Sequence, residues 1–423
     1  TRNTILKSYF VGEVVGKNYV GGLVGFDTTY VYSKNVTNII SKSFSAGPVT
    51  GKSFVGGLLG GNTYHSEKGG RVNSEIDSAY HYEGEVLGDG ENIGGIAGYT
   101  FGKISNSYVV SSVKGMNNVG GIAGSVGADV SNSFFIGDSV IGIYQIGGLV
   151  GIANGKVDSS YSTANVKGDD NVGGLIGSSY GNISYSYATG NVIGDVDNSS
   201  AGNDNLGGLV GYAYKGSISK SLATGDVSGT TKLGGLVGRF DGTSISQSYA
   251  QGNVTGSYYG DPSDEVGNFY IGGLVGYGKG SISEIYVSGS VKGIEDGPVY
   301  TGCIIGYVNG SMEITDSYFD SEKCNLAFEG KTGIATISNS PAQTTDAMQS
   351  SSTYGNWDFI DTWRIIGESY PRLSWFAGSL AEVVVKTASR EDFVYDGNEK
   401  MPAVNSVTLY ETALDEGTDY TIS

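Results

Sequence analysis

The stretch Gly207-Gly208-Leu209-Val210-Gly211 decides the fold of this 423-residue chain, because its pattern occurs ten times along the sequence. The tetrad Gly-Gly-Leu/Ile-apolar begins at Gly21, Gly56, Gly94, Gly120, Gly147, Gly173, Gly207, Gly234 and Gly272, and a degenerate tenth copy begins at Gly302, where Cys303 replaces the second glycine. The intervals between copies run from 26 to 38 residues, and the shortest cluster at 26–27. We therefore take 26–27 residues as the basic unit and the excess as insertions.

Each unit holds three short segments with strand character. The glycine tetrad is followed by a segment such as Ile218-Ser219-Lys220-Ser221-Leu222 and then by a valine between glycines, such as Val227. Segments of about four to six residues, bounded by Gly, Asn, Asp or Ser, are too short for helices. Units of this length are also too short for propeller blades, which need roughly 40 residues. We predict an all-β chain, in which residues 1–320 form a parallel β-helix of about ten three-strand coils.

The glycines have two expected uses. Corners of the coil need a positive φ, and close backbone approach leaves no room for a Cβ. Against the basic unit, insertions enter at only two corners, near Asp27–Ile39 and Gly61–Glu75 and then near Gly194–Asn205, Ser257–Tyr270 and Ile294–Thr301. The insertion between Asp195 and Asn205 is acidic, but it lacks the ligand spacing of an EF-hand or a calcium β-roll. We expect a solvated turn there and no cofactor, with Ca²⁺ as the alternative.

An aromatic residue ends most of the Ile-Ser-x-Ser segments. The column comprises Tyr9, Phe44, Tyr80, Tyr108, Phe134, Tyr161, Tyr187, Tyr249, Tyr286 and Tyr318, which should stack at about 4.8 Å per coil. Strict alternation of side chains between the two faces would expose the aromatic residue, but it would also expose the leading Ile or Val in every coil. Because that exposure is implausible, a corner or bulge must interrupt the segment. We favour core packing for the column. The alternative is an outward, ligand-facing aromatic ladder that includes Tyr108, Tyr161, Tyr187, Tyr249 and Tyr286.

Composition and charge exclude several classes of function. The chain has 71 glycines but only six prolines, which excludes collagen, and its formal net charge is −18. No basic patch is present to neutralise phosphates, so we expect no nucleic-acid partner, and an acidic chain should not dock on anionic lipid. No stretch has the length of a membrane span, so we expect no membrane insertion within this chain. Cys303 and Cys324 form a candidate disulfide, which would require an oxidising compartment; two free thiols are the alternative.

The repeat pattern dissolves near Asp320. All three tryptophans follow this point, and an open solenoid end must be covered, so residues 321–378 are predicted to form a C-terminal cap and linker. Within this part, Thr344–Gln349 is typical of a capped helical turn. Residues 379–423 contain two apolar runs separated by Tyr395-Asp396-Gly397 and are interpreted as a truncated Ig-like module. We also expect the chain to be a fragment of a longer protein.

No catalytic motif is evident. The two histidines, His65 and His81, fit neither His-Glu-x-x-His nor a Ser-His-Asp arrangement, and both are expected at the surface. A glycoside hydrolase needs two carboxylates across a cleft, and the nearest approach to a cluster is Asp261, Asp264 and Glu265. We therefore expect no enzymatic activity.

The Gly-Gly-Leu-Val-Gly units, with their Ile-Ser-x-Ser-Tyr and Gly-x-Val-x-Gly segments, closely resemble the GLUG-motif repeats of bacterial surface proteins. The tail with Val394-Tyr395-Asp396-Gly397 and Gly417-Thr418-Asp419-Tyr420 resembles a bacterial Ig-like adhesin module. The resemblance implies a non-catalytic, extracellular segment of a cell-surface adhesin or stalk, or of a secreted metallopeptidase, with a host or microbial surface glycan or protein as partner. A carbohydrate-binding or polysaccharide-processing β-helix is the alternative function. The resemblance supplies no functional residues.

Overall fold

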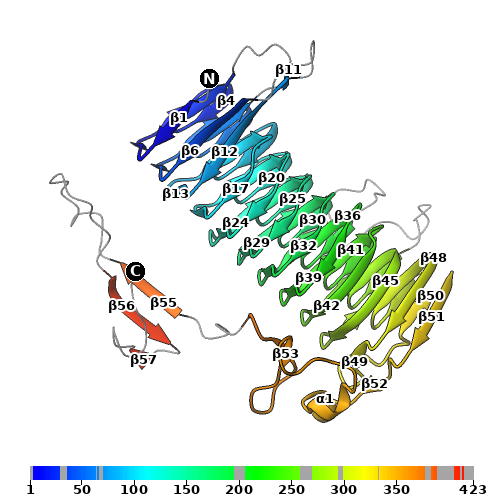
Figure 1. Ribbon diagram of the computed structural model, residues 1–423. Helices are drawn as coiled ribbons and strands as arrows, with labels where there is room; N and C mark the ends of the chain where they lie inside the picture. Colours follow the sequence, from blue (N-terminus) through cyan, green and yellow to red (C-terminus); the bar gives the residue numbers. More distant parts are fainter. Residues whose placement is uncertain are drawn as a thin grey trace. The chain divides into compact units, whose positions relative to one another are not determined.

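The computed structural model describes residues 3–28, 36–62, 64–65, 70–194, 205–257, 269–293, 299–331, 333–376, 383–387, 404–409 and 412–413. Contacts divide the chain into one unit of residues 1–357 and a second of residues 358–423. The first unit is a parallel β-helix, which confirms the predicted fold class (Figure 1). Each regular coil contributes five short strand segments, and these segments form five columns that belong to three sheets.

The first column precedes the Gly-Gly corner and forms a sheet of ten parallel strands. Its members are β4 (Asn18–Gly21), β9 (Ser53–Gly56), β15 (Glu91–Gly94), β20 (Asn117–Gly120), β25 (Tyr144–Gly147), β30 (Asp170–Gly173), β35 (Asn205–Gly207), β40 (Lys232–Gly234), β44 (Phe269–Gly272) and β47 (Val299–Gly302).

The second column follows the Gly-Gly corner. Its members are β5 (Val24–Asp27), β10 (Leu59–Asn62), β16 (Ala97–Thr100), β21 (Ala123–Val126), β26 (Val150–Ala153), β31 (Ile176–Ser179), β36 (Val210–Ala213), β41 (Val237–Phe240), the first parts of β45 (Val275–Val287) and β48 (Ile305–Thr315), and β50 (Glu329–Lys331).

The third column contains the Ile-Ser pairs. Its members are β1 (Thr4–Leu6), β6 (Val36–Ser41), β12 (Gly70–Asp77), β17 (Ile104–Ser105), β22 (Val130–Ser131), β27 (Val157–Asp158), β32 (Ile183–Ser184), β37 (Ser217–Ser219), the first part of β42 (Ser244–Ala250), later parts of β45 and β48, and β51 (Ile334–Ser338). A short strand, β11 (Tyr64–His65), pairs antiparallel with β12.

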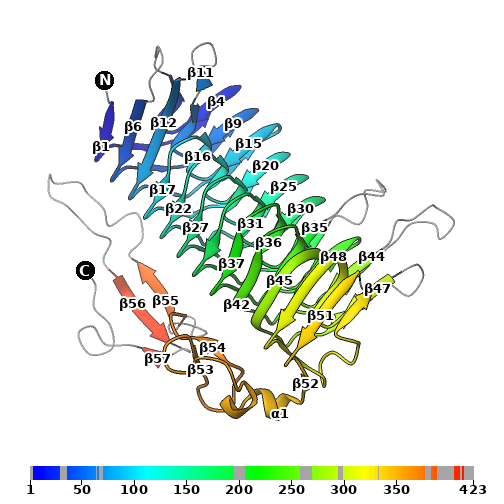
Figure 2. The ribbon, with the colours of Figure 1, turned by 45° about the vertical axis from the view of Figure 1, so that its right-hand side comes forward.

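The fourth column carries the aromatic residues. Its members are β2 (Tyr9–Val11), β7 (Phe44–Ala46), β13 (Tyr80–Tyr82), β18 (Tyr108–Val110), β23 (Phe134–Phe135), β28 (Tyr161–Ser162), β33 (Tyr187–Ala188), β38 (Leu222–Ala223), the ends of β42 and β45, β49 (Tyr318–Asp320) and β52 (Ala342–Gln343). Columns two, three and four together make up one large sheet (Figure 2).

The fifth column contains the glycine-flanked valines and forms the second sheet of ten parallel strands. Its members are β3 (Val14–Val15), β8 (Val49–Gly51), β14 (Val86–Gly88), β19 (Val113–Lys114), β24 (Ser139–Ile141), β29 (Asn165–Gly168), β34 (Val192–Gly194), β39 (Val227–Gly229), β43 (Val254–Gly256) and β46 (Val291–Lys292).

The core is one apolar column shared by all coils. In a regular coil the inward side chains include Val172, Leu175, Ile176, Ile183 and Val192, each at most 1% exposed. Identical positions pair in register from coil to coil, as Val172 pairs with Leu206 and Ile176 with Val210. A single coil could not exclude water from such side chains, so stacking supplies the burial that stabilises each coil.

The Gly-Gly motif is a corner and not a strand. Gly173 ends β30 and Ile176 begins β31, so Gly174 and Leu175 make the bend between two sheets. A Cβ on Gly174 would lie 2.1 Å from the carbonyl oxygen of Gly208 in the next coil, and one on Gly173 would lie 2.0 Å from the carbonyl oxygen of Ile176. Neither glycine lies in the left-handed region. Close approach therefore explains both glycines of this corner. The expected positive φ occurs at glycines of other corners, such as Gly47, Gly84 and Gly216, with φ of 106°, 81° and 81°.

Non-glycine residues adopt a positive φ at two positions of the coil: two residues before the Gly-Gly pair in the first six coils, as at Asn118 and Asn171, and at the middle residue of each Ile-Ser-x-Ser segment. Asn106, Asn132 and Ser159 have φ of 51°, 48° and 50°, and the same conformation recurs in every coil of this column. Asparagine tolerates this conformation best, although Lys, Ser, Tyr and Glu also occupy it here. The left-handed residue turns the chain and shifts the alternation of side chains by one position, which is the predicted interruption.

Beyond the expected boundary at residue 320, the ladder continues for one irregular coil made of β50, β51 and β52. The predicted helical turn is present as α1 (Thr345–Met348), and the Thr344 hydroxyl accepts a hydrogen bond from the Ala347 N–H. A 3₁₀ turn, η1 (Ser351–Thr353), follows.

In the second unit, β53 (Trp363–Arg364) and β54 (Arg372–Leu373) form an antiparallel pair with Trp363 buried. A separate antiparallel sheet contains β55 (Val383–Thr387), β56 (Val404–Leu409) and β57 (Thr412–Ala413).

Candidate functional site

The aromatic column of the fourth strand position is an outward-facing stack over its first seven coils. Ring centroids of neighbours from Tyr9 to Tyr187 lie 4.6–5.2 Å apart, and the ring planes are within 8° of parallel. The residue after each aromatic points inward instead: Val109, Phe135 and Ala188 are fully buried. The favoured prediction of core packing was therefore wrong for these coils, because the left-handed residue two positions earlier reverses which face the aromatic residue occupies.

The candidate ladder residues do not share one environment. Tyr108, Tyr161 and Tyr187 are half-buried on the outer face, whereas Tyr249 and Tyr286 are only 2% and 0% exposed. Tyr249 and Tyr286 still stack, at 4.9 Å, but Leu222 interrupts the run between them and Tyr187. Tyr249 and Tyr286 therefore cannot face a ligand while they remain covered.

Stacking determines which parts of the rings remain accessible. Because each half-buried ring lies flat against its neighbours, the ring faces are occupied within the column and the ring edges point outward. A sugar ring packs on an aromatic face, so this column is a poor platform for carbohydrate. Burial raises the pKa of Tyr80 to about 12 and also raises the pKa values of Tyr108 and Tyr161, so these phenols stay neutral.

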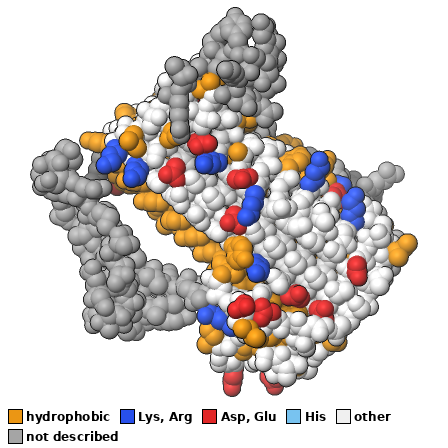
Figure 3. All heavy atoms as spheres, in the orientation of Figure 1, with side chains coloured by type: hydrophobic (Ala, Val, Ile, Leu, Met, Phe, Trp, Pro, Cys, Tyr) orange, Lys and Arg blue, Asp and Glu red, His pale blue; other side chains and the backbone are white. Residues whose placement is uncertain are grey.

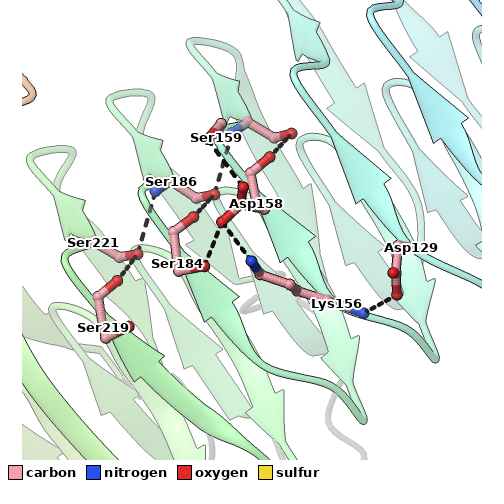
Figure 4. Close-up of polar contacts among 9 residues, drawn as sticks. Asp129, Lys156, Asp158, Ser159, Ser184, Ser186, Ser219 and Ser221 are labelled. Carbon is pink, nitrogen blue, oxygen red and sulfur yellow. Dashed lines mark hydrogen bonds and ion pairs between the residues drawn. The ribbon is translucent and has the colours of Figure 1, made fainter.

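A buried serine directly precedes most of the aromatic residues, and Figure 4 shows two members of this serine column, Ser186 and Ser221. The Ser186 hydroxyl donates to the carbonyl of Ser184 at 2.8 Å and accepts from the backbone N–H of Ser160 at 3.2 Å. The hydroxyl of Ser221 repeats both bonds one coil later, with Ser219 and Ser186. Each hydroxyl thus supplies an acceptor for a backbone N–H of the preceding coil. It is held by a carbonyl that also accepts a backbone N–H, as the carbonyl of Ser184 does from Ser159. The need for this acceptor explains the serine that precedes most of the aromatic residues.

Sequence reasoning missed a second aromatic cluster, which surrounds Arg239. Its guanidinium lies 4.6 Å from the ring centroid of Tyr212 and 5.6 Å from that of Tyr277, and it pairs with Asp241 at 2.8 Å. The Tyr212 hydroxyl donates to the same Asp241 carboxylate, and burial together with this bond raises the pKa of Tyr212. These residues directly follow the Gly-Gly-x-x-Gly pentad, so their position in the repeat was the available signal.

Two more tyrosine pairs extend this cluster. Tyr277 stacks on Tyr307 at 5.4 Å and Tyr270 on Tyr300 at 5.6 Å, and the rings of Tyr270 and Tyr277 are tilted by 55°. Tyr270 and Tyr300 lie near the C-terminal ends of two of the inserted segments, on β44, which begins at Phe269, and on β47, which begins at Val299. Two of the insertions therefore contribute a tyrosine to the cluster.

Cys303 and Cys324 form a disulfide in the structure. Cys303 occupies the second glycine position of the tenth corner, where earlier coils have no space for a Cβ. In the next coil, the corner before β50 has no glycine pair, and the Cys303 N–H donates to the carbonyl of Ala327 at that corner. The column of close glycine contacts ends here, which leaves room for the side chain.

The histidine expectation was wrong for His81. Its side chain is fully buried in the core, and its Nδ1 lies 2.9 Å from the hydroxyl of Ser45. Burial lowers the pKa of His81 to about 4, so the ring is neutral in the folded chain. The side chain of His65 lies outside the described residues.

The other chemical expectations concern segments that are only partly described. The acidic insertion Asp195–Asp204 and the cluster Asp261, Asp264 and Glu265 lie outside the described residues. Among the residues that the structure describes, no group of three His, Cys, Asp or Glu side chains could hold a metal ion. Within the same residues, no helix is long and apolar enough to span a membrane.

The in-register coils, the glycine corners and the serine and aromatic columns define the first unit as a repeat protein of the parallel β-solenoid class. Residues 168–193 and 202–228 match the family model described as the GLUG motif, and each match covers one full coil. The chain therefore contains a GLUG repeat region. No curated protein sequence matches the chain, and no solved structure does.

Proposed function

We propose that this chain is a non-catalytic spacer in an extracellular, cell-surface protein of the adhesin or stalk type. The observation that carries the proposal is the unbroken parallel pairing of the third column from β1 to β51. Twelve strands at about 4.8 Å per step give a rod of about 53 Å. The packed core leaves the rod solid, as the buried leucines of the Gly-Gly corners illustrate.

Two further features support this role. The disulfide between Cys303 and Cys324 suits an oxidising compartment, which is consistent with an extracellular location. The net charge of −18 opposes self-association of a long apolar-cored rod. We retain the interpretation of residues 379–423 as an Ig-like module of such a surface protein, and a surface glycan or protein as its partner.

A deletion in register tests the spacer role. Removal of residues 121–173 joins Gly120 to Gly174 and should eliminate two coils while every column stays continuous. Spin labels on Lys103→Cys and Lys279→Cys, both exposed positions, should then lie about 10 Å closer in pulsed electron paramagnetic resonance. Removal of residues 121–160, which breaks the register, is the matched control and should unfold the chain. A register-preserving deletion that unfolds the chain, or that leaves the label distance unchanged, would refute the proposal.

Carbohydrate binding is a second candidate, favoured by the cluster around Arg239. Unlike the stacked column, Tyr270 and Tyr277 meet at 55°, so their ring faces are not all covered by parallel neighbours. A glycan array with the wild-type chain and with Tyr277→Ala tests this candidate. Binding that Tyr277→Ala abolishes would support it, and an array without binding would remove it.

A further inference from the structure

The aromatic column is covered at one end and open along most of its length. Tyr286 and Tyr318 are at most 1% exposed, whereas the rings from Tyr80 to Tyr187 remain half-exposed. Beside the open rings, Val110 at the end of β18 is 43% exposed, and Ile136, directly after β23, is 41% exposed. Figure 3 shows a band of hydrophobic side chains that runs along the solenoid. We call the outward side chains of β13, β18, β23, β28 and β33, together with Ile136 directly after β23, the open strip.

The covered end shows what chemistry the column accepts. Trp357 packs on Tyr318 at 5.7 Å with a 74° tilt and on Tyr286 at 6.4 Å. Its indole N–H donates to the carbonyl oxygen of Asp316 at 3.0 Å, and Asp316 is the left-handed residue of that coil. Tyr354 adds an edge-to-face contact with Tyr318 at 4.8 Å. The ring of Tyr318 and the carbonyl of Asp316, two residues before it, thus form one receptor for an indole.

The same pair of groups recurs along the open strip. Asn106, Asn132 and Ser159 are the left-handed residues that precede Tyr108, Phe134 and Tyr161 by two positions. Within the described part of the chain, no hydrogen bond reaches the backbone carbonyl oxygens of these three residues. Each of these three coils therefore presents an aromatic ring beside a carbonyl acceptor, as the coil of Tyr318 does.

The dimensions of the strip favour one kind of occupant. Five coils at about 4.8 Å per step span about 19 Å, which matches an extended segment of about six residues. With a width of about 10 Å the strip offers about 200 Å², well below the roughly 800 Å² per partner of a stable protein interface. A second copy of the chain would therefore need contacts beyond the strip, whereas an extended peptide would not.

We propose that the open strip binds an extended, tryptophan-bearing polypeptide segment in the way that Trp357 covers Tyr318. Aromatic contact with the ring edges supplies apolar burial, and the indole N–H pairs with the carbonyl of a left-handed residue. This inference is independent of the spacer role, because a rod can keep its length whether or not its side is occupied.

Titration of the full chain with a peptide of residues 350–361 tests the proposal. The peptide carries fluorotryptophan at the position of Trp357, and fluorine NMR follows its resonance. We expect a saturable shift, and a peptide with phenylalanine in that position should bind about tenfold more weakly because it lacks the N–H donor.

Two variants of the chain locate the binding. Val110→Asp combined with Ile136→Asp leaves the core and the stacked rings in place and should weaken binding about tenfold. Ile334→Asp, at an isoleucine 71% exposed outside the strip, is the control and should bind as the wild type does. Absence of a saturable shift, or equal binding by both variants, would overturn the proposal. A dimer in light scattering that the double variant abolishes would also overturn it, in favour of a second copy of the chain.

Discussion

Replacement of Gly174 by alanine is the most direct test of why the Gly-Gly corner requires glycine. The added methyl group would lie 2.1 Å from the carbonyl oxygen of Gly208 and 2.9 Å from the Cβ of Ala188. The backbone on both sides is fixed by hydrogen bonds, since the Gly174 N–H donates to Gly207 and the Leu175 N–H to Leu209 at 2.9 Å. The two coils must therefore separate by about 1 Å, which combines overpacking with the loss or weakening of two backbone bonds. We expect a destabilisation of about 3–5 kcal/mol.

Thermal unfolding followed by far-UV circular dichroism measures this effect, and we expect a fall in Tm of about 5–10 °C. Gly61→Ala is the matched control, because a Cβ there would meet only side-chain rings, those of Tyr19 at 3.4 Å and Phe54 at 3.5 Å, which are ordinary contact distances. This control should melt within about 2 °C of the wild type. Equal Tm values for Gly174→Ala and Gly61→Ala would refute close approach as the reason for the motif.

Three further predictions follow from buried groups. Acidification should destabilise the coils around His81, because the folded pKa of His81 is about 4 and lies below the unfolded value of 6.5. The stabilisation by neutral His81 is complete above pH 6.5 and decreases by up to about 3 kcal/mol by pH 4. In urea titrations of His81→Val, this pH dependence should be absent. Ser186→Ala should cost about 1–3 kcal/mol in urea unfolding, because it leaves the buried Ser160 N–H without its acceptor, and an unchanged midpoint would contradict this role. Reduction of the Cys303–Cys324 disulfide should cost roughly 3 kcal/mol and increase hydrogen exchange near the last coils, whereas unchanged exchange there would show that the bond is not stabilising.

Sequence periodicity predicted the stacking of the coils, but it did not predict for every segment which side chains face the core and which face solvent. The Gly-Gly-x-x-Gly spacing gave the coil length because each coil repeats one close contact, as between Gly174 and Gly208. The facing of Tyr161 could not be read from alternation, since one left-handed residue, Ser159, reverses it and serine has no strong preference for that conformation. The serine column was visible in the sequence, but its hydroxyl bonds depend on neighbours about 26 residues away.

The Arg239 cluster and the burial of Tyr286 were beyond sequence reasoning for a related reason. Both depend on side chains from several coils or from the segment after the solenoid, as Trp357 covers Tyr286. His81 was assigned to the surface because histidine is polar, yet its position directly after Tyr80 is the inward position of the repeat. Once the left-handed residue is recognised, the same offset identifies Val109 and Phe135 as core residues.

The placement of the insertions links the fold to a spacer role. Although ten residues separate Gly194 from Asn205, Val172 still pairs with Leu206 across that corner and Val192 with Val227. The length of a coil in sequence can therefore vary while its rise along the solenoid stays at about one strand spacing. The corners can accept new segments without a change in the length of the rod, because the pairing that determines this length lies entirely within the strands. Loop composition and rod length are thus separable properties of this chain, which is the property that a spacer carrying variable surface segments requires.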